Sequence, residues 1–198
     1  MLAAGTLAGC ASLNTLDADV SSYGTWPPGR APGSFAFERL PSQQAQGERQ
    51  AQLEAAARGA IEKAGFTHAA EPATADVTVQ LGARITRYDI SPWSDPFWWH
   101  WPGGYWRHPG WYSGWYSGPY GFGGPYYYGG APRYDREVAL LIRDRRTGTP
   151  LYETRAVSDG YSVGDVALLS AMFEAALWDF PTPAVSPRQV SVPLAAGR

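Results

Sequence analysis

Residues 77–86 read Val-Thr-Val-Gln-Leu-Gly-Ala-Arg-Ile-Thr, and apolar and polar side chains alternate along the whole stretch. Successive side chains of a β-strand point to opposite faces, so the apolar members all fall on one side of an extended chain. One face of this strand therefore meets a core while the other meets water, which is typical of an antiparallel sheet covered on one side. The rest of the chain has to supply its strand partners and the layer that covers its apolar face.

Two helices are predicted to form that layer. The first has an apolar stripe with helical spacing, made of Leu53, Ala56, Ala57, Ala60, Ile61 and Ala64. Gly65 follows where a helix C-cap is expected. The second helix is predicted over residues 163–178, with Asp165 as N-cap or first-turn acid and Pro181 as its end. Its stripe comprises Val166, Leu169, Phe173 and Leu177, widened by Leu168, Met172 and Ala176.

Further strands are predicted before and after the first helix. Residues 138–142 are apolar on both faces and indicate a central strand. Turn-forming residues 144–148 lead to its hairpin partner at 151–157, and shorter strands are expected at 20–26 and 34–40. This order predicts an α+β fold with an antiparallel sheet of about four to five strands and two amphipathic helices packed on one face.

The composition indicates one domain with attached tails. The chain has 198 residues, 44% of them hydrophobic, and a formal net charge of −2, which gives no electrostatic reason to expect a nucleic-acid partner. The expected organisation is a residual signal peptide (1–9), a lipidated cysteine with its tether (10–19), a single α+β domain (20–181) and an extended C-terminal tail (182–198).

The only cysteine suggests how the chain is attached to a membrane. Cys10 follows Leu7-Ala8-Gly9, and this stretch resembles the lipobox of bacterial lipoproteins, whose cysteine is acylated after signal cleavage. Residues 1–9 contain no Lys or Arg and are short for a signal peptide, so either translation starts upstream of Met1 or the match is fortuitous. No other segment approaches the ~20 apolar residues of a membrane-spanning helix, so the lipid is the expected attachment.

An insertion at residues 89–133 differs in composition from everything around it. It holds seven of the nine tryptophans, with seven tyrosines and many glycines and prolines. Proline and glycine at this density oppose regular secondary structure, so we expect a long loop between two strands. Three interpretations remain open: a low-complexity insert, a self-association surface, or a binding surface for an envelope protein, a glycan or a lipid head group. The candidate binding residues are Trp93, Trp98, Trp99, Trp101, Trp106, Trp111, Tyr112, Trp115 and Tyr116.

No catalytic or metal-binding pattern is found. The histidines are His68, His100 and His108, and none stands at a metal-ligand spacing from other ligands on a regular element. A Gly-x-Ser-x-Gly elbow is absent, and Gly121-Phe122-Gly123-Gly124 does not follow a strand into a helix. We therefore expect no enzyme activity, no metal and no cofactor.

Several short motifs occur in an order that resembles one family of bacterial lipoproteins. They are Tyr23, Phe35 with Phe37, Lys63 to Phe66, Ala75 to Val79, Asp144 to Gly148, Leu151-Tyr152 and Phe180-Pro181. With the N-terminal lipobox they resemble the family catalogued as domain of unknown function 4136, over most of residues 10–181 apart from the insertion. The family has no established catalytic residues, so the resemblance implies a fold and a compartment only. Ala11 replaces the aspartate that retains such proteins at the inner membrane, which implies the outer membrane and a periplasmic domain.

These observations lead to one expectation about function and one alternative. The expected protein is an outer-membrane-anchored periplasmic lipoprotein that acts as a non-enzymatic binding or structural module of the cell envelope. Its aromatic insertion is the candidate interaction surface. The alternative is an envelope hydrolase or carbohydrate-active enzyme whose residues come together only in three dimensions.

Overall fold

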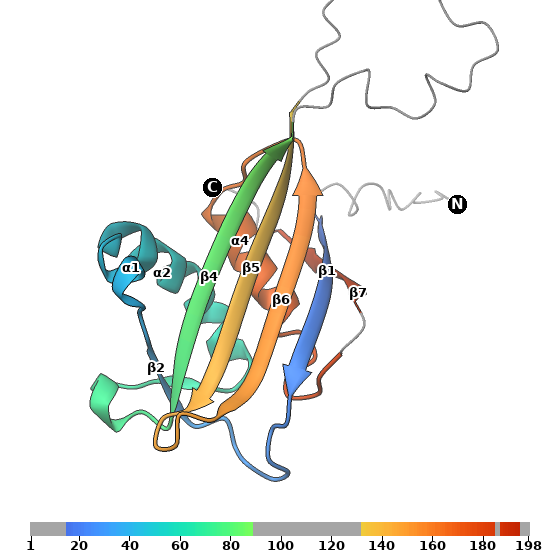
Figure 1. The fold of residues 1–198 in the computed structure, drawn as a ribbon. Coiled ribbons are helices and arrows are strands. Elements are labelled where there is room, and N and C mark those ends of the chain that lie inside the picture. Colours follow the sequence, from blue (N-terminus) through green and yellow to red (C-terminus); the bar gives the residue numbers. More distant parts are fainter. Residues whose placement is uncertain (1–14, 89–131, 185–186, 195–198) are drawn as a thin grey trace, which may run out of the picture. The chain divides into compact units, whose positions relative to one another are not determined.

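The computed structural model describes residues 15–88, 132–184 and 187–194. Of these, residues 15–86, 134–184 and 187–194 belong to one compact unit. Its sheet has seven strands in the described residues, in the order β3-β2-β4-β5-β6-β1-β7 (Figure 1). The strands are β1 (Thr15–Gly24), β2 (Ser34–Phe37), β3 (Thr67–His68), β4 (Val77–Tyr88), β5 (Arg133–Asp144), β6 (Pro150–Gly160) and β7 (Arg188–Pro193). The helices are α1 (Pro41–Gln44), α2 (Gly47–Lys63) and α4 (Val166–Ala176), with a short 3-10 turn η2 (Pro72–Thr74).

The α+β class is confirmed, but the sheet is larger than predicted and is mixed. β1 runs antiparallel to β6 and β7, and β5 runs antiparallel to β6. β2, however, pairs in parallel with both β3 and β4. The helix pair α1–α2 lies between β2 and β4 in the chain, and a helical crossover of this kind returns the chain in the same direction. The predicted purely antiparallel sheet of four to five strands was therefore wrong in strand number and in this pairing.

The strand predicted at 20–26 is confirmed as part of β1, but β1 begins earlier, and β7 comes from the expected C-terminal tail. β1 begins at Thr15, inside the expected tether, and buries Leu16, Ala18 and Val20 at alternate positions. β7 lies inside the expected C-terminal tail and pairs with β1, burying Val190 and Val192. The tail is extended, as expected, but it belongs to the sheet.

All the helices lie on one face of the sheet, with α2 behind β4 and α4 behind β5 and β6 in the view of Figure 1. The predicted stripe of α2 is confirmed, because Leu53, Ala57 and Ile61 are buried. Glu54, off the stripe, is also buried and accepts two hydrogen bonds from Arg39, at 2.6 and 2.7 Å. Burying this carboxylate is tolerated because the arginine pairs with both of its oxygens.

The two long helices pack together at their C-terminal ends. Alanines face each other there, and their small side chains allow close approach: Ala57, Ala60, Ala171, Ala175 and Ala176 are all nearly inaccessible. Lys63 Nζ also lies 2.6 Å from Glu174 Oε1 near both C-termini. Toward their N-termini a cavity lies between the helices, lined by residues of both and of the sheet. Part of the sheet is therefore left without a helical cover.

The central hairpin is confirmed as predicted. β5 is the fourth of the seven strands and pairs with β6 from Tyr134–Gly160 to Arg143–Pro150. Gly148, with φ of +71°, completes the turn. β4 and β5 are neighbours in the sheet, so residues 89–131 connect two adjacent strands, as the sequence predicted.

Candidate functional site

The residues that the sequence analysis proposed as sites fall almost entirely outside the described residues. Cys10 does so, and so do the nine aromatic candidates: Trp93, Trp98, Trp99, Trp101, Trp106, Trp111, Tyr112, Trp115 and Tyr116. Of the three histidines only His68 is described. It is exposed on β3, and its ring packs edge-on against Phe35 with centroids 5.2 Å apart.

A different site lies at the cavity between the two long helices. Val77, Val79 and Leu81 point from β4 toward the helices and are buried, which confirms the predicted alternation. Ala83 and Ile85 continue the same face of the strand, yet both are exposed, Ile85 by 46%. The apolar face of β4 thus extends beyond the helices that cover it.

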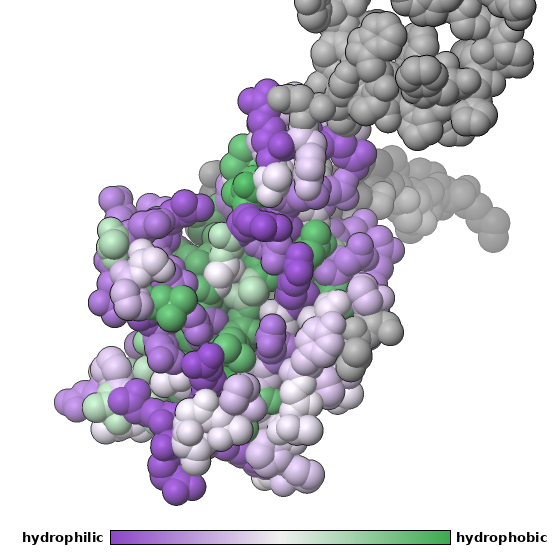
Figure 2. Space-filling model, viewed as in Figure 1, coloured by the Kyte–Doolittle hydropathy of each residue, from purple (hydrophilic) through white to green (hydrophobic). Residues whose placement is uncertain are grey.

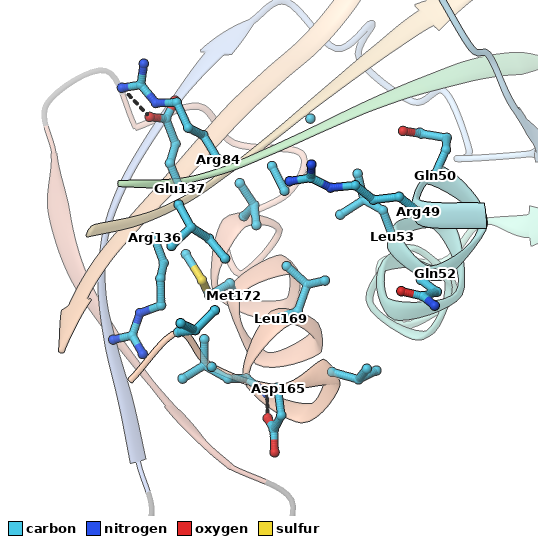
Figure 3. Close-up of a pocket in the computed structure, with 18 of the residues that line it drawn as sticks. Arg49, Gln50, Gln52, Leu53, Arg84, Arg136, Glu137, Asp165, Leu169 and Met172 are labelled. Carbon is cyan, nitrogen blue, oxygen red and sulfur yellow. Dashed lines mark hydrogen bonds and ion pairs between the residues drawn. The ribbon is translucent and has the colours of Figure 1, made fainter. Parts of the chain in front are cut away.

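The uncovered region forms a groove of about 470 Å³, a size typical of small-molecule sites. Its walls are the N-terminal part of α2, the last part of β4, the first part of β5 and the start of α4 (Figure 3). All its lining residues belong to the compact unit described above. We call this cavity the α2–α4 groove.

The floor and one wall of the groove are apolar. Leu53, Val138 and Met172 are buried at its base. Val163 and Val166, at the start of α4, also line it and are exposed by 50% and 61%. Apolar side chains left open to water inside a concavity favour an apolar ligand, since burying their surface lowers the free energy.

The entry into α4 is fixed by local chemistry. Gly164 has a φ of +86°, and a side chain there would meet Leu168 at 3.0 Å. Asp165 then caps the helix by accepting a hydrogen bond of 2.9 Å from the backbone N–H of Leu168, which confirms its predicted role. The first turn of α4 is therefore held in place, and with it the apolar wall of the groove.

Gln50 is a polar residue buried in the wall of the groove. Its side chain is on the sheet-facing side of α2 and only 6% of its surface is exposed. The Nε2 atom is buried and has no hydrogen-bond partner among the described residues. A buried donor without an acceptor lowers the stability of the fold. A ligand with a hydrogen-bond acceptor at this position would therefore bind more tightly.

Arg136 is a buried cation in the opposite wall. It is 6% exposed and donates hydrogen bonds to Asp159 O at 2.6 Å and Ser158 Oγ at 3.3 Å. It forms no ion pair with a carboxylate in the described part of the chain, and its Nε has no partner there. Burial lowers the pKa of the Arg136 guanidinium, while the charge of Asp159 opposes that shift. A buried cation without a paired anion favours a negatively charged ligand group.

Arg49 adds a second unpaired cation to the groove. Its side chain extends from α2 toward the space under the strands (Figure 3) and makes no hydrogen bond or ion pair with any described residue. The two carboxylates of the lining are engaged elsewhere. Glu137 pairs with Arg155 at 2.9 Å and Arg84 at 3.4 Å, and Asp165 caps α4. The groove therefore combines an apolar floor with two arginines, Arg49 and Arg136, that have no carboxylate partner among the described residues.

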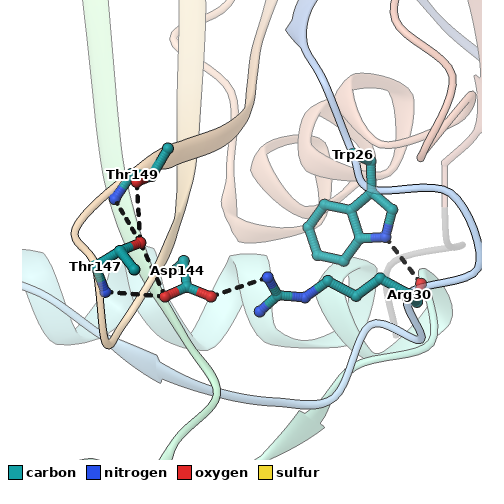
Figure 4. Close-up of polar contacts among 5 residues, drawn as sticks. All are labelled: Trp26, Arg30, Asp144, Thr147 and Thr149. Carbon is teal, nitrogen blue, oxygen red and sulfur yellow. Dashed lines mark hydrogen bonds and ion pairs between the residues drawn. The ribbon is translucent and has the colours of Figure 1, made fainter.

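A second polar cluster, shown in Figure 4, has the opposite character. Asp144 accepts hydrogen bonds of 2.9 Å from Arg30 and from the backbone N–H of Thr147. The Arg30 guanidinium also stacks over Trp26, whose Nε1 donates to the Arg30 carbonyl at 2.9 Å. Because the cation and the carboxylate pair with each other, the cluster connects the loop after β1 to the β5–β6 turn. It presents no unpaired charge to a ligand.

The sheet face opposite the helices is mixed in character. Figure 2 shows hydrophobic residues in its middle with hydrophilic residues around them. Ala139, Leu141 and Val157 occupy half-buried outward positions on β5 and β6. Charged Glu153 and Arg155 pair with Leu141 and Ala139 across the two strands. Because charges interrupt the apolar surface, we do not assign a site to this face.

No group of three or more His, Cys, Asp or Glu side chains among the described residues is placed to hold a metal ion. None of the described helices is long and apolar enough to cross a membrane.

The chain is thus a small α+β domain whose helices cover one face of a mixed sheet and leave a groove between them. The chain belongs to the family described as Domain of unknown function (DUF4136), whose profile matches residues 17–182. This match confirms the resemblance that the sequence motifs suggested. No curated protein sequence matches the chain.

Solved structures resemble the chain at low sequence identity. A PDZ domain protein from Parabacteroides distasonis aligns with 91% of this chain at 15% identity and a TM-score of 0.49, and this chain spans 40% of its length. A PelC dodecamer from Paraburkholderia phytofirmans aligns with 80% of this chain and 94% of its own, at 10% identity and a TM-score of 0.40. A DUF4136 family protein from Bacteroides thetaiotaomicron aligns with 81% of this chain and 94% of its own, at 20% identity and a TM-score of 0.29.

Sequence analysis did not find the groove, although it identified many of its residues as core. Ala83 and Ile85 were correctly placed on the apolar face of their strand, and Val166 on the apolar stripe of its helix. A pattern predicts which face is apolar but does not predict whether another element reaches far enough to cover it. One signal was present in the sequence: the apolar face of β4 continues as far as Ile85.

Proposed function

We propose that this chain is a non-enzymatic binding module of the bacterial cell envelope, and that the α2–α4 groove is its binding site. The observation that carries the proposal is the groove itself. Apolar positions on β4 and α4 are open to water beside two buried polar side chains, Gln50 and Arg136. Their Nε2 and Nε atoms, respectively, have no hydrogen-bond partner in the part of the chain that the structure describes. Stable domains rarely keep such surface and such donors uncompensated unless a ligand completes them.

The compartment is part of the same proposal. Acylation of Cys10 and a position on the periplasmic side of the outer membrane rest on the lipobox-like stretch, on Ala11 and on the family resemblance. In this compartment the domain would be tethered near lipids, and the groove would be available to molecules of the envelope. The aromatic insertion, residues 89–133, stays a second proposed interaction surface on the strength of its composition.

A groove-filling substitution tests the proposed function. Ala83→Phe places a large apolar side chain in the groove from an exposed position, so the fold tolerates it while the cavity is reduced. The matched control is Gln80→Phe, on the opposite face of the same strand. Both are made in the full chain carrying Cys10→Ser, so that no attached acyl chain competes. The ligand is an uncharged naphthylamine dye whose fluorescence rises in apolar surroundings.

The expected result is saturable dye binding by the parent chain and by the Gln80→Phe variant, and weak or no binding by the Ala83→Phe variant. Circular dichroism of the three chains checks that their folds agree. If the parent chain shows no saturable binding, or if Ala83→Phe binds as the parent does, the groove is not a binding site and the proposal is wrong.

A further inference from the structure

The polar groups of the α2–α4 groove indicate which class of ligand it binds. This inference rests on the proposed function of the groove as a binding site. The two unpaired cations belong to opposite walls, Arg49 to α2 and Arg136 to β5. Between them lies the apolar base of Leu53, Val138 and Met172. An apolar body with one anionic end matches this arrangement, whereas a fully apolar or a fully polar molecule would leave one half of it unused.

We propose that the groove binds a single-chain amphiphile with a carboxylate head, such as a fatty acid. The alkyl chain lies on the apolar base and along the exposed valines of α4, Val163 and Val166. The carboxylate lies against the guanidinium of Arg49. The assignment rests on charge complementarity: Glu137 and Asp165, the carboxylates that line the groove, already have partners, whereas neither Arg49 nor Arg136 is paired with a carboxylate among the described residues.

A carboxylate suits these donors for a geometric reason. A free guanidinium presents parallel N–H groups that fit the two oxygens of a carboxylate. Arg49 is free to do this because no described residue holds its side chain. Arg136 is held by Asp159, Ser158 and Ser162, and its Nε has no partner among the described residues, so it contributes mainly through its charge. The Nε2 of Gln50 supplies one more donor at the wall.

The test compares three ligands that share one alkyl chain: laurate, lauryl alcohol and lauryl phosphate. Each displaces the naphthylamine dye from the full chain carrying Cys10→Ser. Two variants are compared with the parent, Arg49→Gln in the groove and Arg58→Gln as its control. Arg58 lies on the same helix, is exposed and is not part of the lining. Both substitutions are at exposed positions, so both variants are expected to fold.

The parent chain is expected to bind laurate at least about tenfold more tightly than the alcohol, since a hydrogen bond to a charged group contributes about 1.5–3 kcal/mol. Arg49→Gln should remove most of this preference and leave alcohol binding unchanged. Arg58→Gln should change neither. Raising the salt concentration should weaken laurate binding more than alcohol binding, because the head group lies near the surface.

Several results would overturn this inference while leaving the proposed function intact. Equal affinities for laurate and the alcohol would mean that the arginines do not bind the carboxylate head group. A loss of preference in Arg58→Gln as large as in Arg49→Gln would indicate a general charge effect. Tighter binding of lauryl phosphate than of laurate would assign a phosphate head instead. If light scattering shows a dimer of the parent chain that Ala83→Phe dissociates, the groove is covered by a second copy. Absence of dye binding would instead refute the proposed function.

Discussion

Lys63 and Glu174 join the C-terminal ends of α2 and α4 through an ion pair of 2.6 Å. Alanines between the helices allow this approach, and the groove opens at the other end, where alanines give way to Leu53 and Leu168. The ion pair is largely exposed and contributes little energy by itself. The buried alanines therefore contribute more than this ion pair to holding the two helices together.

The alanine contact can be tested by overpacking it. Ala57 is fully buried on α2, and Ala57→Leu should lower the free energy of unfolding by about 1–3 kcal/mol because the helices would have to move apart. Ala55→Leu is the control, since Ala55 is exposed on the same helix and a surface change should stay within about 0.5 kcal/mol. Urea denaturation of both variants measures the difference. Equal effects at the two positions would contradict the packing described here.

The uncompensated amide of Gln50 predicts a stabilising substitution. Gln50→Leu removes a buried donor without a partner and adds apolar surface to the wall, so the free energy of unfolding of the ligand-free chain should rise by about 1 kcal/mol. Gln52→Leu, at an exposed position two residues along, should leave stability nearly unchanged. Thermal unfolding in ligand-free buffer provides the measurement. A loss of stability in Gln50→Leu would mean that the amide has a partner that the arrangement described here lacks.

Stability at acid pH should depend on Asp144. The backbone N–H of Thr147, the guanidinium of Arg30 and the hydroxyl of Thr147 hold the pKa of this carboxyl at about 2, below its ordinary value of 3.8. A lowered pKa in the folded state means that the carboxylate stabilises the fold fully above about pH 4, and that this contribution is lost as the pH falls toward about 2.

The Asp144→Asn variant should therefore be less stable than the parent chain at neutral pH, and the difference should vanish near the low end of that range. Denaturant unfolding at a series of pH values shows the convergence. Asp19→Asn, at an exposed position on β1, serves as the control. A stability difference for Asp144→Asn that is the same at every pH would contradict the ion pair with Arg30.

The proposed anchor predicts a change of location in the cell. Cys10→Ser removes the thiol that would carry the lipid, so the chain should move from the membrane fraction to the soluble fraction. Intact-mass analysis of the parent chain from membranes should show the added mass of acyl chains, since stable anchoring needs more than one. Unmodified Cys10 in a soluble parent chain would exclude the lipoprotein assignment.

The aromatic insertion can be removed without interrupting the sheet, because β4 and β5 are neighbouring strands. Replacing residues 93–128 by a short Gly-Ser turn should leave the circular dichroism spectrum of the domain unchanged. If the insertion is an interaction surface, the shortened chain should lose binding to envelope fractions, glycans or partner proteins in pull-down experiments. Unfolding of the shortened chain would show that the aromatic residues are structural. Unchanged binding would show that the insertion is passive.

The sequence by itself determined the strands and helices whose apolar residues recur with a clear periodicity. Alternation along residues 77–85 predicted β4, the run at 138–142 predicted the central strand, and the stripe from Leu53 to Ala64 predicted α2. The family followed from short motifs. These features are local, because each depends only on which faces of a strand or helix are apolar.

Tertiary structure alone decided the pairing of distant segments and the location of the groove. β7 joins the sheet because β1 has a free edge for it, and β2 is parallel to β4 because a helical crossover separates them. Ile85 lies on the apolar face that its sequence predicts, yet it is exposed, because it lines the open groove between α2 and α4. Whether an apolar side chain becomes core or groove depends on the reach of another element, and no local pattern encodes that distance.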